Sequence, residues 1–420
     1  MRMVTKRKTR ILFLCGSMNI GGSEKNVAAI AKQLDKEKYE PEVYCVFGGG
    51  PLEEQLRENH IRYETGSPGR IFDPKIFRRT YRFIRDGEYD ILHCFGYPVI
   101  YLGVLLGAVV GIKVIVSIQA LDTWKRWSDV MADRALKPFV DLYIADSEGA
   151  RCFAIRQQGI LPAKIMTIYD GVDTASLVPA VDSGALKRDL GIDPEATVVG
   201  VVGRLQDEHK GQSYFIKAIP SIVKDFPRTH FLVVGDGADR GYLEGLVDEM
   251  QVRERVTFAG TRTDLANIFS VIDILVLPSV QWESITKTML EAMSMSRPVI
   301  ATSVGDVGEI ITHGETGMLI PPGEPDEIAG AVKHLLENPG RAAELGRHGA
   351  EHVHERSLTL EKSIRIVENA YEKVLSCGER RGGAAGIRAG LLFLLFNILS
   401  LAYRIYAGLL NIFGRERAGQ

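Results

Sequence analysis

The stretch Pro278-Ser-Val-Gln-Trp-Glu-Ser-Ile-Thr-Lys-Thr-Met-Leu-Glu-Ala-Met293 carries the strongest signal in the sequence. It follows the apolar run Ile274–Leu277, which predicts a buried strand, and its second half has the composition of a helix. Glu283 falls in the loop, and Glu291 falls about two turns into the expected helix. Between them we expect the unpaired backbone N–H groups of a helix N-terminus, which bind anions. The residues expected there are Ser284, Ile285 and Thr286.

An anion at this point indicates a particular kind of ligand. A phosphate on the N–H groups, with one carboxylate on a ribose and the other on a hexose, describes a nucleotide-sugar pocket. A pair of glycosidase carboxylates fits less well, because such groups face one bond at roughly 5–10 Å. Helical positions eight residues apart differ by about 12 Å in rise alone.

Short apolar runs rich in β-branched residues alternate with helical segments along the chain, which is typical of parallel α/β layers. We expect an α/β fold of GT-B type, with two Rossmann-like doubly wound domains facing a central cleft at the carboxyl ends of their strands. The expected strands are Ile11–Cys15, Glu42–Phe47, Ile91–Cys94, Val114–Ile118 and Leu142–Ala145, then Val198–Val202, Phe231–Val234, Val256–Phe258, Ile274–Leu277 and Val299–Ala301.

The stretch from Leu177 to Pro194 is rich in Pro, Asp, Ser and Gly and is interpreted as the interdomain connection. The expected domains are residues 1–178 and 179–377, and residues 378–420 form a tail. The run from Val99 to Ile118 has the length of a membrane span, but Gly111 and Lys113 divide it. We therefore expect a buried helix at 99–110 followed by a strand.

The composition of the chain indicates its cellular compartment and excludes one class of partner. A formal net charge of -2 over 420 residues gives no whole-chain field that attracts nucleic acid. The five cysteines are scattered and contain no C-x-x-C pair, which argues for a reducing cytoplasm and against a disulfide framework or structural zinc. The first apolar run, Ile11–Cys15, is shorter than the roughly 7–15 residues of a signal peptide core.

The C-terminal tail differs from the rest of the chain. Residues 389–403, AGLLFLLFNILSLAY, carry no charge, and Arg404 interrupts the apolar run before it resumes. From Gly378 onward, the chain has six Arg and only two Glu. These features predict an apolar helix that lies in a membrane interface and binds anionic lipid, so the protein is expected to be peripheral on the inner face of the cell membrane. The alternative is a hydrophobic oligomerisation helix.

Two loops that follow strands are suited to phosphate or sugar. The first strand leads into Gly21-Gly22-Ser-Glu24, where glycines let the backbone approach a ligand closely. A later strand leads into Gly203-Arg204, and Lys210-Gly211 comes six residues after the arginine. Two cations at a strand end can enclose a diphosphate.

As an ordered set, the G-G-x-E loop, the V-G-R-L…K-G pair and the Glu-x7-Glu stretch resemble retaining glycosyltransferases of family 4. The resemblance spans about residues 10–375. It implies that Arg204 and Lys210 hold the diphosphate of the donor, that Glu283 binds hydroxyls of the donor sugar and that Glu291 binds the ribose. It also implies donor contacts from Gly21, Gly22 and Arg262, the last beside the nucleobase, and an acceptor site in the first domain.

Three positions depart from the family pattern. Many members have His-x-His where this chain has His93-Cys-Phe95, so His93 is a candidate substrate contact. With Phe95 at the second position, either the second histidine's contact is lost or the pocket accepts a different donor. Asp170 stands where the family often has Asn, and Asp306 stands in place of the second glycine of V-G-G-x-x-E. Glu309, which closes that segment, is expected to hold loop structure.

The expected reaction is transfer of a hexose, with retention, from a UDP- or GDP-sugar to a glycan or lipid-linked acceptor, as in cell-surface polysaccharide synthesis. Arg204, Lys210 and the helix N-terminus would stabilise the departing charge. The sequence has no D-x-D triplet, and neither a metal nor another cofactor is expected.

Other functions fit parts of the pattern. A GT-B nucleotide-sugar epimerase would need no acceptor, so incubation with donor alone distinguishes it. A scaffold with a vestigial pocket would not need the four charged residues Arg204, Lys210, Glu283 and Glu291. A soluble transferase acting on a small metabolite or a storage polymer would not need the apolar tail.

Overall fold

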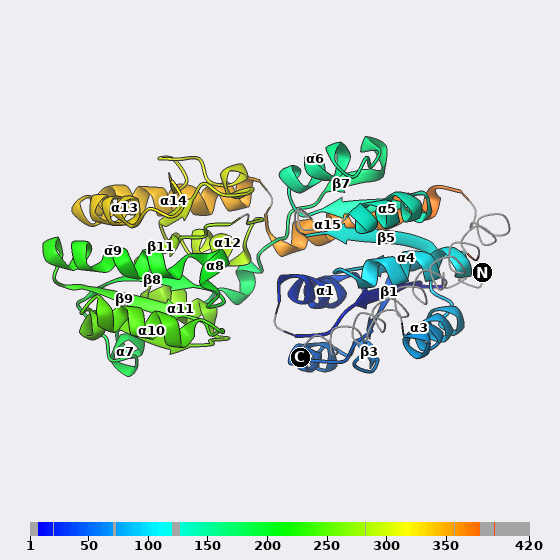
Figure 1. The fold of residues 1–420 in the computed structure, drawn as a ribbon, viewed down its shortest axis with the longest axis horizontal. Coiled ribbons are helices and arrows are strands. Elements are labelled where there is room, and N and C mark those ends of the chain that lie inside the picture. Colours follow the sequence, from blue (N-terminus) through cyan, green and yellow to red (C-terminus); the bar gives the residue numbers. More distant parts are fainter. Residues whose placement is uncertain are drawn as a thin grey trace, which may run out of the picture. The chain divides into compact units, whose positions relative to one another are not determined.

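The structure, a computed structural model, describes residues 7–19, 21–69, 73–119, 127–281, 283–356, 358–378 and 390. They fall into two compact units (Figure 1). Unit 1 holds the described residues of Met1–Ala145, Phe153–Met166 and Ile366–Gln420, and unit 2 holds those of Asp146–Cys152 and Thr167–Arg365. This division differs from a single boundary near residue 178. The stretch expected as the connection lies inside unit 2, where Ser183–Asp189 form the helix α7.

Unit 1 is built on a seven-stranded sheet in the order β3-β2-β1-β4-β5-β6-β7. Its strands are β1 (Thr9–Cys15), β2 (Tyr39–Cys45), β3 (Arg62–Thr65), β4 (Ile91–Cys94), β5 (Lys113–Ile118), β6 (Leu142–Ala145) and β7 (Ile165–Thr167). The helices that lie wholly or partly in this unit are α1 (Gly22–Gln33), α2 (Glu53–Glu58), α3 (Pro74–Asp86), α4 (Val99–Val110), α5 (Trp127–Leu136), α6 (Glu148–Arg156) and α15 (Leu360–Ser376).

Unit 2 has a six-stranded sheet in the order β10-β9-β8-β11-β12-β13. Its strands are β8 (Thr197–Val202), β9 (Thr229–Val234), β10 (Val256–Gly260), β11 (Ile274–Leu277), β12 (Val299–Thr302) and β13 (Met318–Ile320). Besides α7, its helices are α8 (Asp207–Lys210), α9 (Gln212–Asp225), α10 (Arg240–Glu249), α11 (Leu265–Val271), α12 (Lys287–Ser294), α13 (Pro325–Glu337) and α14 (Pro339–Glu355).

The strand order puts a topological switch point in each sheet. Every strand pair with a described register is parallel. In unit 1 the chain moves outward from β1 to β3 and then returns to the other side of β1 at β4. In unit 2 it likewise moves outward from β8 to β10 and then returns to the other side of β8 at β11. In open parallel sheets, ligands bind at such points, outside the carboxyl ends of the strands.

Successive residues of the unit 2 strands face two separate cores. Val198, Leu232 and Leu275 pack with α11 and α12 on one face of the sheet. Val199 and Phe231 pack with α9, α10 and α13 on the other face. Burial on both faces explains why these strands are nearly continuous apolar runs.

The apolar run of residues 99–118 forms the expected helix and strand. Helix α4 is almost entirely buried against the sheet, and Gly111 ends it in the left-handed conformation with a φ of 83°. A Cβ on Gly103 would lie 2.4 Å from the Cys94 Sγ, so small residues let this helix lie close on β4. None of the described helices is both long and apolar enough to cross a membrane.

Ten of the thirteen strands in the described part of the chain were expected from the sequence, and the α/β GT-B architecture is confirmed. The unexpected strands are β3, β7 and β13, each three or four residues long and at or near a sheet edge. Strand β3, Arg-Tyr-Glu-Thr, has no buried residue and therefore no apolar run to reveal it. The predicted tail helix of residues 378–420 lies almost wholly outside the described residues.

Candidate active site

Lys210 and Glu283 meet at the switch point of unit 2. Lys210 ends α8, which follows β8, and Glu283 lies in the loop between β11 and α12. The Lys210 ammonium donates a hydrogen bond to Glu283 Oε1, and the Ser279 hydroxyl donates to the same oxygen at 3.2 Å. Both contacts involve Oε1. None of the described residues donates a hydrogen bond to Oε2, so this oxygen can accept one from a hydroxyl.

The glycine after Lys210 makes this contact sterically possible. Gly211 has a φ of 62°, a left-handed conformation that side chains disfavour. A Cβ there would lie 2.2 Å from the Pro278 carbonyl oxygen. The Val280 N–H also donates to the His209 carbonyl at 2.9 Å, which ties α8 to the loop that carries Glu283. The spacing of Lys and Gly in the sequence therefore has a packing cause.

A third loop supports the backbone of Glu283. Gly305 follows β12 with a φ of 56°, and a Cβ on it would lie 2.0 Å from the Glu283 carbonyl oxygen. The next residue, Asp306, donates its N–H to that oxygen at 2.9 Å. The Glu283 backbone is thus held by the segment that resembled V-G-G-x-x-E.

Helix α12 begins later than the sequence suggested. It starts at Lys287, and Thr286 is its N-cap, with a hydroxyl that accepts from the Met289 N–H at 3.3 Å. Glu291 is therefore just over one turn into the helix, not two. The Ile285 side chain is 6% exposed and belongs to the core, so this residue can offer a ligand its backbone but not its side chain.

Arg204 lies at the carboxyl end of β8, next to the strand that leads to Glu283. Its side chain is exposed, and its carbonyl accepts from the Gln212 side-chain amide at 2.8 Å. Since β8 and β11 flank the switch point, Arg204 and Glu283 follow adjacent strands. Glu291 is half-buried on α12.

Arg262 is already engaged by an acid. After β10, its guanidinium makes a bidentate contact with Asp264, at 2.8 Å from Nε and 2.6 Å from Nη2. This hydrogen-bonded pair lowers the pKa of the Asp264 carboxyl and raises that of Arg262. A nucleobase beside Arg262 would meet a neutralised pair.

The predicted residues of unit 1 differ in exposure. Gly21 is the N-cap of α1, and a Cβ on it would lie 2.3 Å from the Glu24 Oε2. No described atom lies within 4 Å of a Cβ built on Gly22, so a ligand can approach the Gly22 backbone. His93, by contrast, is fully buried on β4. Its Nδ1 and the Tyr371 hydroxyl are 2.8 Å apart, and its Nε2 lies 2.9 Å from the Ser117 hydroxyl.

Burial lowers the pKa of His93 to about 3, so the ring is neutral near pH 7. With both ring nitrogens occupied, His93 is a packing histidine in this structure, and the expected substrate contact finds no support in its surroundings.

A buried acid next to the site was not foreseen. Asp146 is 8% exposed, and its Oδ1 accepts no hydrogen bond from the described residues. Burial, and then repulsion from Asp170 and Asp306, raise its pKa to about 8, which the neighbouring Ser284 partly offsets. The signal in the sequence was the pair of acids at 170 and 306, but nothing along the chain linked them to residue 146.

Glu309 holds the segment that carries these acids. Its carboxylate accepts from the Glu148 and Gly149 N–H groups at 3.0 and 2.6 Å and from the Tyr169 hydroxyl at 3.0 Å. It therefore caps the start of α6, in line with the structural role expected of it.

Two family models match the chain. The one described as Glycosyltransferase Family 4 matches residues 20–176, and the one described as Glycosyl transferases group 1 matches residues 196–338. The chain belongs to the family 4-like glycosyltransferases. The second match contains the Lys210–Glu283 contact and Glu291 of this glycosyltransferase.

Named relatives of this glycosyltransferase include enzymes of glycan assembly. The UDP-Gal:alpha-D-GlcNAc-diphosphoundecaprenol alpha-1,3-galactosyltransferase of Escherichia coli is 26% identical over 324 residues, 73% of this chain and 82% of the relative. The lipopolysaccharide core biosynthesis mannosyltransferase LpsB of Rhizobium meliloti is 27% identical over 215 residues, 50% and 60% of the two chains. Among solved structures, Anabaena HepE in complex with UDP is 22% identical, with a TM-score of 0.78 over 87% of this chain and all of that one, which supports the GT-B fold.

The raised pKa of Asp146 predicts that the folding stability of this glycosyltransferase depends on pH. Because the pKa is about 8 in the folded chain and about 3.8 ordinarily, the folded state holds a proton that the unfolded state releases. The resulting stabilisation is present below pH 4 and is lost as pH rises toward 8, at up to about 1.4 kcal/mol per pH unit.

Asp146→Asn should therefore be more stable than the wild type in urea unfolding at pH 7.5, and the difference should shrink toward pH 4. Asp189→Asn, at an exposed aspartate at the end of α7, is the control and should show no such trend. A constant difference between Asp146→Asn and the wild type across this range would contradict the shifted pKa.

Proposed function

We propose that the protein transfers a hexose, with retention of anomeric configuration, from a nucleotide-diphosphate sugar to a glycan or lipid-linked acceptor. The observation that carries the proposal is the Lys210–Glu283 contact at the unit 2 switch point, beside Arg204. There a cation, a carboxylate and a second cation follow the adjacent strands β8 and β11. A diphosphate needs the cations, and a sugar ring needs the carboxylate.

The donor nucleotide is proposed from this geometry together with the relatives. The E. coli relative is named for UDP-Gal, and HepE is described in complex with UDP and with UDP-glucose. We therefore put UDP-sugars first and GDP-sugars second. Lys210 and Arg204 would bind the diphosphate, and Glu283 Oε2 would accept a hydroxyl of the hexose.

The reaction follows from these positions. The acceptor hydroxyl oxygen attacks the anomeric carbon from the face that the diphosphate leaves, through an oxocarbenium-like state. Its bond to that carbon forms as the bond from the carbon to the diphosphate oxygen breaks, so the configuration is retained. The electron pair of the broken bond stays on the diphosphate, and the hydroxyl proton passes to one of its oxygens. Arg204 and Lys210 stabilise the charge that develops on the leaving group, which is how we account for transfer without a metal or other cofactor.

The acceptor is proposed from the relatives. One is named for a diphosphoundecaprenol-linked sugar and another for lipopolysaccharide core synthesis. With a lipid-linked acceptor, the reaction would take place at the inner face of the membrane in polysaccharide assembly. The tail of residues 378–420, outside the described part of the chain, would contact anionic lipid there.

The proposal is tested with a panel of UDP- and GDP-sugars in two steps. Thermal stabilisation identifies the donor, because a ligand that binds the folded state raises the melting temperature. NMR of the product made from that donor and a polyprenyl-diphosphate sugar then gives the anomeric configuration. Retention in the product supports the proposal, whereas inversion, or turnover of the sugar without an acceptor, counts against it.

Glu291 provides a further prediction. Glu291→Ala should weaken binding of the whole nucleotide sugar sharply, because the ribose loses a charged hydrogen-bond acceptor worth about 1.5–3 kcal/mol. Isothermal titration with the donor measures this loss. Glu351→Ala, at an exposed position on α14, is the control and should bind as the wild type does. Equal affinities for Glu291→Ala and the wild type would remove Glu291 from the site.

A further inference from the structure

The segment Asp146–Cys152 belongs to unit 2, although the chain before and after it belongs to unit 1. Its first residues are fastened to the loop after β12. The Ser147 hydroxyl donates a hydrogen bond to Asp306 Oδ2, and a Cβ on Gly149 would lie 1.9 Å from Asp306 Oδ1. Ser147 and Asp306 are both buried. The place of Asp146, which precedes Ser147, is therefore fixed within unit 2.

The same loop holds the segment that carries Glu283. Asp306 donates its N–H to the Glu283 carbonyl at 2.9 Å. Ser284 follows Glu283 and belongs to the residues that lead to the N-cap of α12. The loop after β12 thus connects Asp146 with the start of α12, where the free N–H groups of a helix favour an anion such as the donor diphosphate.

Two buried polar atoms in this region have no partner. Neither the Asp146 Oδ1 nor the Ser284 Oγ makes a hydrogen bond with the described residues. The two side chains are neighbours, because Ser284 is close enough to Asp146 to act on its pKa. Burying a carboxylate with an unpaired oxygen costs far more free energy than burying a neutral carboxyl group. The packing therefore favours the neutral acid at Asp146.

The charges around Asp146 act in the same direction as burial. Asp170, from the loop after β7, and Asp306 both repel a further negative charge. The other acidic or phenolic groups on the same segments are Glu148, Tyr169, Asp173, Glu283 and Glu309. The cations on or against these segments are Arg151, which pairs with Glu148, Lys210, which pairs with Glu283, Lys287 and Arg356. Among the described residues no cation pairs with Asp146, so an ionised carboxylate there would have no counter-ion.

We propose that Asp146 is a positioning residue of the donor site, and that it must be a neutral carboxylic acid for the nucleotide diphosphate to bind well. The inference rests on the proposed function, since the diphosphate belongs to the donor of that reaction. An ionised Asp146 would place a negative charge beside the segment that has to accept the negative diphosphate. A neutral Asp146 leaves the N–H groups of that segment and the Lys210 ammonium unopposed. Protonation of Asp146 and binding of the diphosphate therefore favour each other.

The affinity for the nucleotide should consequently depend on pH. The pKa of Asp146 is about 8. Below this pH the carboxyl group is already neutral, whereas above it the protein must take up a proton as the nucleotide binds. The dissociation constant should be nearly constant below about pH 7.5 and should then rise by up to about tenfold per pH unit.

The test is isothermal titration of the full chain with UDP and with GDP at intervals from about pH 7 to 9.5. Asp146→Asn replaces the acid by a neutral group of the same shape, so its dissociation constant should not rise with pH. Asp189→Asn, at an exposed aspartate on α7, is the matched control and should keep the rise of the wild type. Circular dichroism at each pH reports whether the proteins are folded.

Ser284→Ala is a second variant, and the direction of its effect is fixed in advance. The Ser284 side chain lowers the pKa of Asp146, so its removal should keep the rise in the dissociation constant but move it to higher pH. A merely structural role of either residue would change the affinity by the same factor at every pH. This comparison with the wild type decides the inference even if Asp146→Asn does not fold.

The outcomes separate this inference from the proposed function. Failure of the wild type to bind either nucleotide at pH 7 would count against the proposed function. Binding at pH 7 that does not weaken by pH 9.5 would overturn the role of Asp146 alone, and so would equal weakening in Asp146→Asn and the wild type. A rise that stays in place or moves to lower pH in Ser284→Ala would also overturn it.

Discussion

Lys210→Met should reduce kcat/KM for the donor about 10²–10³-fold, the loss expected when one group that stabilises developing negative charge is removed. The ammonium contacts Glu283 at the switch point of unit 2. Steady-state kinetics with the donor found in the sugar panel measures the effect. In the same kinetic comparison, Arg204→Ala should reduce transition-state stabilisation by on the order of 2–4 kcal/mol.

A second effect of the Lys210 variant has to be separated from the first. Removing the ammonium leaves the Glu283 carboxylate, which is only 13% exposed, without its cation. Lys210→Met combined with Glu283→Gln relieves that charge and should not restore activity. Lys224→Met, at an exposed lysine on α9, is the matched control and should keep the wild-type kcat/KM. Wild-type turnover in Lys210→Met would remove the lysine from the mechanism.

Gly211→Ala should have an effect of similar size, although glycine has no side chain to contribute. The added Cβ would face the Pro278 carbonyl oxygen at 2.2 Å, and the φ of 62° costs about 1–2 kcal/mol for a residue with a side chain. Relief requires α8 and the loop of Glu283 to move apart. A shift of about 1 Å in a positioning group can lower kcat about 10²-fold.

The control for this variant is another glycine in unit 2. Gly241 lies in α10, where no atom is within 4 Å of an added Cβ, so Gly241→Ala should keep full activity. Circular dichroism and urea unfolding report whether each variant is folded. A Gly211→Ala protein with the melting temperature and kcat/KM of the wild type would show that the close approach to Pro278 does not position Lys210.

The sequence predicted most of the strands, and the position of Arg204, Lys210 and Glu283 at one edge of a sheet, for a physical reason. Strands buried on both faces are apolar throughout, and the residues that follow them lie at one edge of a parallel sheet. Arg204, Lys210 and Glu283 could therefore be assigned to one region from their positions after β8 and β11. The family expected from these motifs is confirmed.

What the sequence could not predict depends on contacts between distant segments. Asp146, Asp170 and Asp306 come from three separate parts of the chain, and the pKa of the first is raised by burial and then by the charges of the other two only in the folded chain. The burial of His93 depends on Tyr371, which is 278 residues away. Helix α12 starts later than expected because Thr286, rather than an earlier residue, supplies the N-cap.

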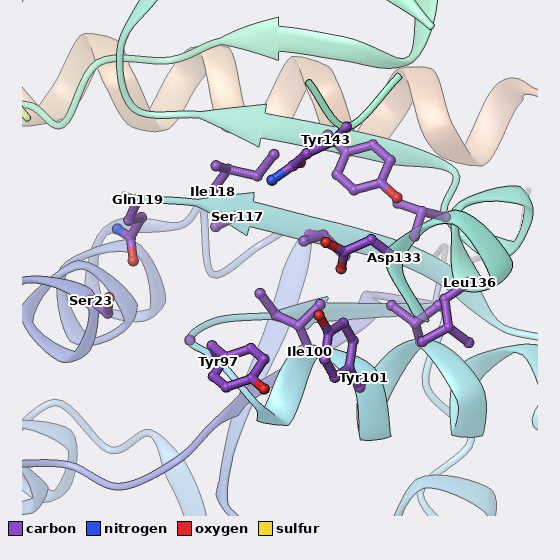
Figure 2. A pocket seen from close by; sticks show the side chains of 15 residues that line it. Ser23, Tyr97, Ile100, Tyr101, Ser117, Ile118, Gln119, Asp133, Leu136 and Tyr143 are labelled. Atoms are coloured by element: carbon purple, nitrogen blue, oxygen red, sulfur yellow. The ribbon is translucent and has the colours of Figure 1, made fainter. Parts of the chain in front are cut away.

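A pocket in unit 1, lined by residues of α4, α5, β5 and β6, could not be predicted from the sequence for the same reason (Figure 2). Its tyrosines lie on α4 and β6 and in the loop after β4, and in the sequence each has the features of an ordinary aromatic residue. No motif connects them, and the Gln119 oxygen, which has no partner among the described residues, is buried only in the folded chain.

Stabilisation of the leaving diphosphate by Arg204 and Lys210, without a metal ion, is tested most directly by the initial rate of transfer after treatment of the wild-type protein with a chelator. The predicted result is a rate equal to that of the untreated protein and insensitive to added manganese. A rate that vanishes with the chelator and returns with manganese would contradict it.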